Sequence, residues 1–156
     1  MKLEIGSGNK PQKGYIHFDI RAGIGADVVG DARELPFKEG ECDEVYSRFF
    51  LEHLPRKDAL LALKEMFRVL KRDGKLEIIV PNIAYFCKLF SEESGQKKEW
   101  ALNKIYGFEH YKEDHHFFGY DEEILSKALK ESGFIEIKRA DEEEQYLHLT
   151  AKKPLK

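Results

Sequence analysis

The sequence predicts a single α/β domain, residues 1–156, with a mostly parallel seven-stranded sheet and an antiparallel C-terminal strand. Strand-like and helix-like patterns alternate along the chain, and the first five strands are too far apart in sequence to be joined by hairpin turns. The last two strands flank a short acidic turn, Asp141–Glu144, which favours an antiparallel hairpin. A chain of 156 residues, 42% of them hydrophobic, can bury one sizeable core.

The expected strands are short runs, and in all but the third and fourth of them apolar residues alternate with polar ones. The seven runs are Lys2–Ile5, Tyr15–Asp19, Asp27–Gly30, Asp43–Ser47, Lys75–Val80, Phe134–Arg139 and Tyr146–Ala151. Strands covered by helices on both faces are normally apolar throughout, so this alternation indicates that one side of the sheet is polar.

Two helices are expected to cover the sheet. The first runs from about Lys57 to Leu70, where apolar residues recur every three or four positions, and Asp73-Gly74 should end it. The recurring residues are Leu60, Leu63, Phe67 and Leu70. The second runs from about Asp121 to Ser132, with an aspartate at its N-cap and Gly133 after its end.

Little room remains for helices on the second face of the sheet. Only Ser7–Gly14 separates the first two strands, and the connection from Ile20 to Asp27 is equally short. We therefore expect reduced helix cover on one face, which meets either water or a second subunit of a possible homodimer. Charged residues such as Lys2, Glu77 and Lys138 on that face make a polar contact the more favourable of the two.

Residues 83–119 are expected to form one or two short helices and a loop that serves as a lid or an acceptor-side insertion. Their aromatic residues are interpreted mainly as core, with part of them able to wall an acceptor pocket. These residues are Tyr85, Phe86, Phe90, Trp100, Tyr106 and Phe108.

Composition limits the possible partners and the cellular location. A net charge of −3 gives no electrostatic reason to expect binding to nucleic acid. No apolar run approaches the roughly 18 residues that a membrane span needs, and no leader pattern begins the chain, so a cytoplasmic protein is expected. Cys42 and Cys87 are interpreted as buried thiols in a reducing compartment. The 35% of charged residues, with few Asn and Gln, leans toward a thermophilic source.

Polar residues follow four of the strands, at the ends where parallel α/β sheets bind ligands. Gly6-Ser7-Gly8 follows the first strand, Asp19 ends the second, Asp31 follows the third, and Ser47-Arg48 ends the fourth. The glycines let a ligand approach the backbone closely, and a carboxylate at Asp19 suits a ribose diol. Asp31 could accept from an adenine amino group. An adenosine ligand without phosphates would need no helix N-terminus behind the glycines.

Four segments occur in the order and spacing of one family. They are "EIGSGNKPQKGYIHFDI", "GDARELPF", "CDEVYSRFFLEHLP" and "ALKEMFRVLKRDGKLEIIVPN". The chain resembles the class I S-adenosylmethionine-dependent methyltransferases, which have a Rossmann-like fold, and among them the small predicted methyltransferases that begin at the first glycine motif. The likeness covers nearly the whole chain. It departs from the pattern at Asn9-Lys10-Pro11, where a third glycine is absent, and in lacking the N-terminal helices that commonly cover the cofactor.

The resemblance implies a methyltransferase that binds S-adenosylmethionine and releases S-adenosylhomocysteine. The residues that it places around the cofactor are Glu4, Gly6, Ser7 and Gly8 beside the methionine part, Asp19 at the ribose, Ile20, Asp31 and Ala32 at the adenine, and Ser47 and Arg48 below the sulfonium. The implied acceptor is a small molecule or a saccharide-linked substrate, which the acidic balance also favours over nucleic acid.

Proton removal from the acceptor, where it is needed, suits histidine, whose ordinary pKa is about 6.5. His116, which takes the place of the group's late histidine, is the first candidate base and His53 the second. No metal ion is expected: a zinc site built from His110, His115 and His116 is an alternative, but no cysteine pair or second tight ligand pair supports it. Two alternatives stay open: a nicotinamide-dependent oxidoreductase, although the spacing after Gly8 does not suit one, and a non-catalytic adenosyl-binding or interaction module.

Overall fold

Over residues 1–108 and 110–156, which the computed structural model describes, seven strands form one sheet in the order β3-β2-β1-β4-β5-β7-β6. The strands are β1 (Lys2–Ile5), β2 (Ile16–Asp19), β3 (Val28–Val29), β4 (Cys42–Arg48), β5 (Leu70–Pro81), β6 (Ile135–Arg139) and β7 (Tyr146–Lys152). Strands β1 to β5 pair in parallel, and β7 pairs antiparallel with both β5 and β6. The predicted fold class is confirmed, with strand bounds that differ by a few residues.

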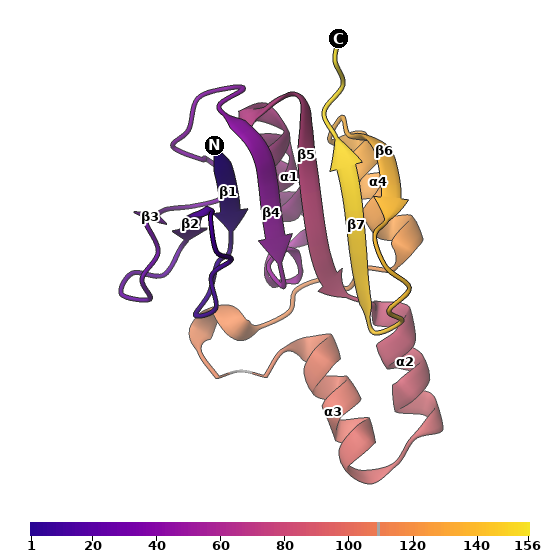
Figure 1. Cartoon of the computed structure of the whole chain (residues 1–156). Coiled ribbons are helices and arrows are strands. Elements are labelled where there is room, and N and C mark those ends of the chain that lie inside the picture. The colour runs from indigo at the N-terminus through magenta and orange to yellow at the C-terminus, as the bar shows by residue number, and fades with distance from the viewer. Residues whose placement is uncertain (109) are drawn as a thin grey trace.

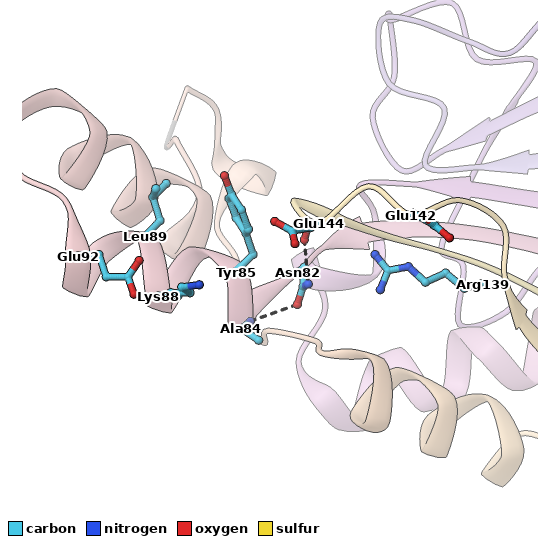
Figure 2. A pocket seen from close by; sticks show the side chains of 9 residues that line it. All are labelled: Asn82, Ala84, Tyr85, Lys88, Leu89, Glu92, Arg139, Glu142 and Glu144. Atoms are coloured by element: carbon cyan, nitrogen blue, oxygen red, sulfur yellow. Dashed lines mark hydrogen bonds between the residues drawn. The ribbon is translucent and has the colours of Figure 1, made fainter.

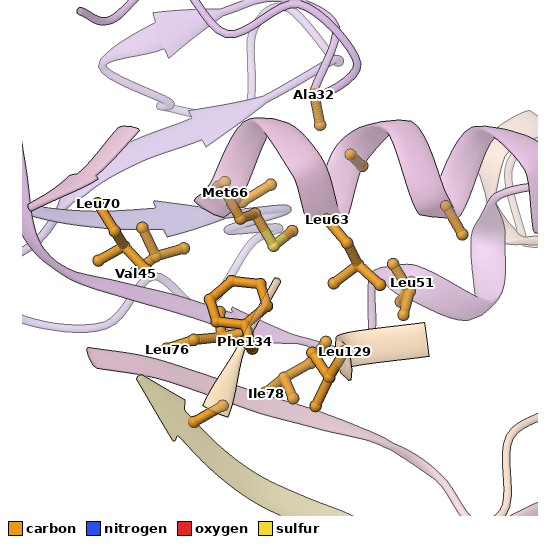
Figure 3. Close-up of a cluster of buried hydrophobic side chains, with 14 of the residues drawn as sticks. Ala32, Val45, Leu51, Leu63, Met66, Leu70, Leu76, Ile78, Leu129 and Phe134 are labelled. Atoms are coloured by element: carbon orange, nitrogen blue, oxygen red, sulfur yellow. The ribbon is translucent and has the colours of Figure 1, made fainter. Parts of the chain in front are cut away.

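Two helices, α1 (Arg56–Val69) and α4 (Glu122–Glu131), lie on the same face of the sheet (Figure 1). The core fills the space between them and the strands, where Leu63 and Met66 of α1 meet Leu76 and Ile78 of β5 (Figure 3). The buried positions of α1 are Ala59, Ala62, Leu63, Met66 and Val69. Leu60 and Phe67, which the sequence placed on the apolar stripe, are only partly buried, so the true stripe is turned by about one residue.

The end of α1 corrects the sequence-based boundary. The helix ends at Val69, and Leu70, expected as its last residue, is fully buried and pairs with Cys42 of β4. Asp73 and Gly74 lie inside β5 instead of ending the helix, and the amide of Asp73 donates to the carbonyl of Lys153. Burial and strand pairing thus override the local turn signal.

The second helix begins as its sequence predicts. Asp121 is the N-cap, and its carboxylate accepts a hydrogen bond from the amide of Ile124 at 2.8 Å. Gly133 follows the helix at φ +100°, which is the left-handed conformation that favours glycine at a helix C-terminus. This confirms both terminal signals.

The opposite face of the sheet carries no helix in the part of the chain that the structure describes (Figure 1). Its side chains form ion pairs along the sheet, including Lys2 with Glu44 and Lys75 with Glu77. The predicted polar face is confirmed, with one exception. Glu4 is buried, because the chain after Gly8 folds back over it and the amide of Gln12 donates to its carboxylate.

Residues 83–106 form two helices, α2 (Ile83–Glu92) and α3 (Gly95–Tyr106), which extend beyond the carboxyl ends of the parallel strands (Figure 1). Phe86 is fully buried and packs against Trp100 of α3, with ring centroids 5.3 Å apart. Tyr106 and Phe108 are 59% and 38% exposed, so the interpretation of the aromatic run as core is wrong for these two.

The structure also tests the expectations about the two cysteines and about membrane-spanning segments. Cys42 is buried, which raises the pKa of its thiol to about 11, but Cys87 is exposed on α2, contrary to the expectation of two buried thiols. Among the helices described, none combines the length and the apolar character needed to cross a membrane.

Candidate functional site

The turn after β1 requires glycine. Gly6 and Gly8 have φ values of +71° and +59°, in the left-handed region that other residues rarely adopt. The amide of Gly6 donates to the carbonyl of Phe18 in β2, 2.8 Å away. A Cβ atom on Gly6 would lie 2.6 Å from the ring of Phe50, so no side chain fits at this position.

Asp19, at the end of β2, is tied directly to this glycine turn. The amide of Gly8 donates to its Oδ2 atom at 3.0 Å. The backbone amide and Nε of Arg21 both donate to Oδ1, each at 3.0 Å. Burial opposes ionisation of this carboxyl, but the hydrogen bonds from Arg21 and Gly8 outweigh it and lower its pKa. The ribose candidate is therefore an ionised carboxylate beside the glycine turn.

Arg21 connects Asp19 to the segment beyond α3. Its guanidinium lies over the ring of Tyr111, 4.6 Å from the centroid. Neither Arg21 nor Tyr111 was predicted from the sequence as a site residue. The signal for Arg21 was its spacing, two residues after the strand-end aspartate, which lets the side chain fold back onto the carboxylate.

Asp31 has the same arrangement with Arg33, whose Nε donates to both carboxylate oxygens at 3.0 Å. This pairing is the main reason why the pKa of Asp31 is lowered. Asp31 adjoins Asp19 through the backbone, because the amide of Gly30 donates to the carbonyl of Asp19 at 3.1 Å.

The other two adenine candidates lie differently. Ile20 is 57% exposed and free to pack on a ligand, whereas the side chain of Ala32 is buried in the core. Only the backbone of Ala32 can therefore meet a ligand.

Two buried hydroxyls at this edge lack partners. The Oγ atoms of Ser7 and Ser47 are buried and make no hydrogen bond within the described chain. Ser47 pairs in register with Ile5, one residue before the glycine turn, so both serines lie at the ends of adjacent strands. Unpaired buried hydroxyls are uncommon and point to a missing polar partner. The pair fits an adenosyl cofactor, which carries amine, carboxylate and hydroxyl groups.

Arg48 ends β4 beside these serines, and Phe49 follows the strand. Arg48 is exposed, and its guanidinium lies 4.8 Å from the centroid of the Phe49 ring. Phe49 has φ +51°, a strained conformation for a residue with a side chain. Glu4, by contrast, is already engaged, since the amide of Gln12 donates to it at 2.6 Å and His17 Nδ1 lies 3.0 Å from it.

The two candidate bases, His53 and His116, come together although they lie far apart in the sequence. Their ring centroids are 4.7 Å apart. His53 Nδ1 donates to the carbonyl of His115 at 3.2 Å, and His116 Nδ1 donates to the carbonyl of Lys104 at 3.1 Å. Each neutral ring therefore keeps its lone pair on Nε2. Burial and the neighbouring His53 lower the pKa of His116 to about 4, and burial also lowers that of His53.

Glu52, which was not predicted from the sequence as a site residue, is the third member of this cluster. Its side chain is buried, and neither carboxylate oxygen has a hydrogen-bond partner in the described chain. Burial raises its pKa to about 8. Leaving a buried polar group without a partner costs about 1–3 kcal/mol. The available signal was an acidic residue beside a histidine inside the apolar run "FFLEHLP".

The structure thus brings most of the candidates into two groups. Gly6, Ser7, Gly8, Asp19 and Ser47 converge at the ends of β1, β2 and β4, with Asp31 nearby, and His53 and His116 form a second group with Glu52. A separate groove of about 660 Å³ lies between α2 and the turn after β6 (Figure 2). Its lining residues, such as Tyr85, Lys88 and Arg139, include none of the candidates.

The first half of the chain matches a known domain family. Residues 3–78 match the family described as "Methyltransferase domain". The demethylmenaquinone methyltransferases of Staphylococcus aureus strains are 30% identical over 128 residues, covering 71% of this chain and 48% of the relative. The chain thus spans about half the length of the curated relatives that it matches.

Several solved structures resemble this fold over nearly the whole chain. A SAM-dependent methyltransferase of Thermotoga maritima, described as a possible histamine N-methyltransferase, is 21% identical with a TM-score of 0.67, covering 97% of this chain and 81% of that one. One from Methanosarcina mazei is 18% identical with a TM-score of 0.66, covering 99% and 92%. Residues 3–78 are therefore similar to the methyltransferase domain family, and the chain has the fold of the class I S-adenosylmethionine-dependent methyltransferases.

Proposed function

We propose that this protein transfers a methyl group from S-adenosylmethionine to a small-molecule or saccharide-linked acceptor. The observation that carries the proposal is the hydrogen bond from the Gly8 amide to the Asp19 carboxylate, because it joins the two elements that a phosphate-free adenosyl group needs. The methyltransferase domain over residues 3–78 supports the choice of cofactor.

Residues at the ends of β1, β2 and β4 would hold the cofactor. Gly6 and Gly8 leave the backbone bare for close approach, and the Asp19 carboxylate can accept hydrogen bonds from the two ribose hydroxyls. The unpaired hydroxyls of Ser7 and Ser47 would gain partners in the amine or carboxylate of the methionine part. Asp31 and the backbone of Ala32 would meet the adenine edge, Ile20 would cover its face, and Arg48 would lie below the sulfonium.

The chain contributes mainly by positioning. When bound, S-adenosylmethionine supplies an activated methyl group for in-line displacement by a nucleophilic atom, with S-adenosylhomocysteine as the product. Holding the nucleophile in line with the methyl group lowers the entropy cost of bringing the two reactants together, which speeds the transfer. A protein base is needed only where the acceptor is a weak nucleophile until it loses a proton. His116 and His53 would accept a proton at Nε2. The lowered pKa of His116, about 4, makes it a weak base at neutral pH, which favours an acceptor that is already nucleophilic.

The arm formed by α2 and α3 is the proposed acceptor-side wall. It extends beyond the same end of the sheet as the glycine turn (Figure 1). The exposed rings of Tyr106 and Phe108 give it apolar surface, and the Lys104 ammonium lies 5.2 Å from the centroid of the Phe108 ring. An aromatic wall with a nearby cation suits a small acceptor that combines apolar and anionic parts.

Calorimetry tests the cofactor. S-adenosylmethionine and S-adenosylhomocysteine should each release heat with a stoichiometry near one, and NAD should release none. Equal binding of NAD would contradict the proposal and favour an oxidoreductase. Methyl transfer from isotope-labelled cofactor into fractionated metabolite, saccharide and RNA pools then identifies the acceptor class, with label expected in one of the first two.

A non-catalytic adenosyl-binding module is the second candidate. The observation that favours it is the lowered pKa of His116, about 4, which leaves the first candidate base weakly basic at neutral pH. Heat of binding without label transfer into any of the pools would support this alternative over the enzyme.

A further inference from the structure

The cluster of Glu52, His53 and His116 has features that methyl transfer does not explain. One possible ligand atom from each residue lies within 4.8 Å of the others. Glu52 is 2% exposed, and both its carboxylate oxygens lack a partner among the described residues. The Glu52 carboxyl group would give up its proton on binding a cation, and both neighbouring imidazoles keep a free lone pair on Nε2.

We propose that Glu52, His53 and His116 bind a divalent metal ion of the zinc class. Two neutral imidazoles and one carboxylate form a ligand set that zinc accepts, and three protein ligands leave a coordination position open for an exogenous oxygen or nitrogen atom. The metal would supply the positive partner that the Glu52 carboxylate lacks. The site is a property of the chain itself and does not depend on the proposed methyl transfer.

The hydrogen bonds around the histidines support this assignment. Metal-bound histidines usually donate their second ring nitrogen to a carbonyl or carboxylate, which fixes the tautomer and the ring orientation. Here both Nδ1 atoms donate to backbone carbonyls, those of His115 and Lys104. Both rings are therefore already held with the lone pair on Nε2.

The backbone holds the two halves of the cluster together. Glu52 and His53 belong to the 3-10 helix η1 (Leu51–His53), which follows β4. The carbonyl of Glu52 accepts from the amide of Phe117 at 2.8 Å, which fixes the loop carrying His116 against η1. Nitrogen and oxygen ligands on one zinc ion stand roughly 3.3 Å apart, since each bond is about 2.0 Å, so ligand atoms within 4.8 Å of one another would need to approach by at most about 1.5 Å.

The assignment also gives His53 and His116 a role other than that of bases. An Nε2 lone pair bound to a metal ion cannot accept a proton, so the two roles exclude each other. A base role would need His116 free, whereas a ligand role makes Glu52 as important as either histidine.

The test is a titration of Zn²⁺ into the chain of residues 1–156 after removal of metal with EDTA, without any adenosyl compound. The wild-type protein should bind one ion per chain. Glu52→Gln, which preserves size and removes the charge, and His116→Gln should each weaken the affinity at least tenfold. His115→Gln is the matched control, because it makes the same change one residue away, and its affinity should equal that of the wild type. Visible absorption of Co²⁺ in place of Zn²⁺ should show a tetrahedral or five-coordinate band that the first two variants lose.

Three results would overturn the proposal: no stoichiometric binding by the wild type, equal binding by Glu52→Gln, or equal losses in His115→Gln and His116→Gln. Circular dichroism checks the folding of each variant, and should Glu52→Gln not fold, the comparison of His115→Gln with His116→Gln decides. Titration of S-adenosylhomocysteine into the same samples tests the proposed function separately, so failure of the metal site and failure of the cofactor site remain distinguishable.

Discussion

Arg21 and Gly8 share the carboxylate of Asp19: Arg21 donates to Oδ1 from Nε at 3.0 Å and to Oδ2 from Nη2 at 3.3 Å, and the Gly8 amide donates to Oδ2 at 3.0 Å. The carboxylate at the end of β2 is therefore shared between the turn that shapes the candidate site and a side chain that competes with a ligand for it. This relationship leads to the first two predictions.

Replacing Asp19 with asparagine should weaken binding of S-adenosylhomocysteine at least tenfold, because the ribose hydroxyls lose an anionic acceptor. Arg21→Met should instead strengthen binding severalfold, since the diol no longer competes with the guanidinium. Calorimetry on both variants checks this pair of opposite effects. Asp27→Asn, which alters an exposed carboxylate that accepts from the amide of His17, should bind like the wild type. Weaker binding by Arg21→Met would show that Arg21 helps to hold the ligand.

The lowered pKa of Asp19 makes part of the folding stability depend on pH. The carboxyl has a lower pKa when folded than its ordinary 3.8, so the native state binds fewer protons. Its contribution is therefore fully present above about pH 5 and is lost as the pH falls through the folded pKa. Urea unfolding should show Asp19→Asn less stable than the wild type by about 1–3 kcal/mol at pH 7, with the difference shrinking below about pH 4. A difference that is constant from neutral to acidic pH would contradict this account.

Gly6→Ala should destabilise the protein by about 2–4 kcal/mol, because it adds steric overlap to backbone strain. The new Cβ would meet the Phe50 ring at 2.6 Å, at φ +71°. Gly40→Ala is the matched control, since Gly40 has φ +67° and a Cβ atom there would have nothing within 4 Å, and it should lose only about 1–2 kcal/mol. Urea unfolding measures both. Equal losses would mean that Phe50 yields to the new methyl group.

Ser47→Ala should leave the stability of the free protein unchanged or raise it by up to about 1 kcal/mol, because it removes a buried hydroxyl without a partner in the described chain. Affinity for S-adenosylmethionine should fall severalfold in the same variant. The control is Ser132→Ala, whose buried hydroxyl donates to the carbonyl of Ala128 at 2.9 Å. That variant should lose about 1 kcal/mol of stability and keep its affinity. Unfolding and calorimetry together separate a hydroxyl kept for a ligand from one kept for the fold.

Phe86→Ala should destabilise the chain by about 3–5 kcal/mol, since the ring is fully buried between α3 and β7. Phe90→Ala, on the same helix but only partly buried, should lose about 1 kcal/mol or less. Thermal unfolding of both variants tests whether the α2–α3 arm is a packed part of the domain. A small effect of Phe86→Ala would indicate an arm that contributes little to global stability.

The order of elements, the N- and C-terminal signals of α4 and the polar face of the sheet could all be predicted from the sequence. Each depends on residues close together in the chain. Asp121 caps α4 by accepting from the amide three residues later, and successive residues of a strand point to opposite faces. The glycine turn and Asp19 were also identifiable, because each lies at the end of a predicted strand. Strand ends in a parallel sheet meet at one edge.

Only the tertiary structure decided the conformation and burial of residues whose long-range contacts compete with a local sequence signal. Leu70 became a strand residue because β4 pairs with it, although helix periodicity and Asp73-Gly74 favoured a longer helix. Glu4 became buried because the chain at Gln12 folds over it. Glu52 and His53 are neighbours in the sequence, but His116 joined them only when the loop after α3 docked on η1. Contacts between residues so far apart in the chain leave no periodic pattern along it, so only folding brings these three side chains into one cluster.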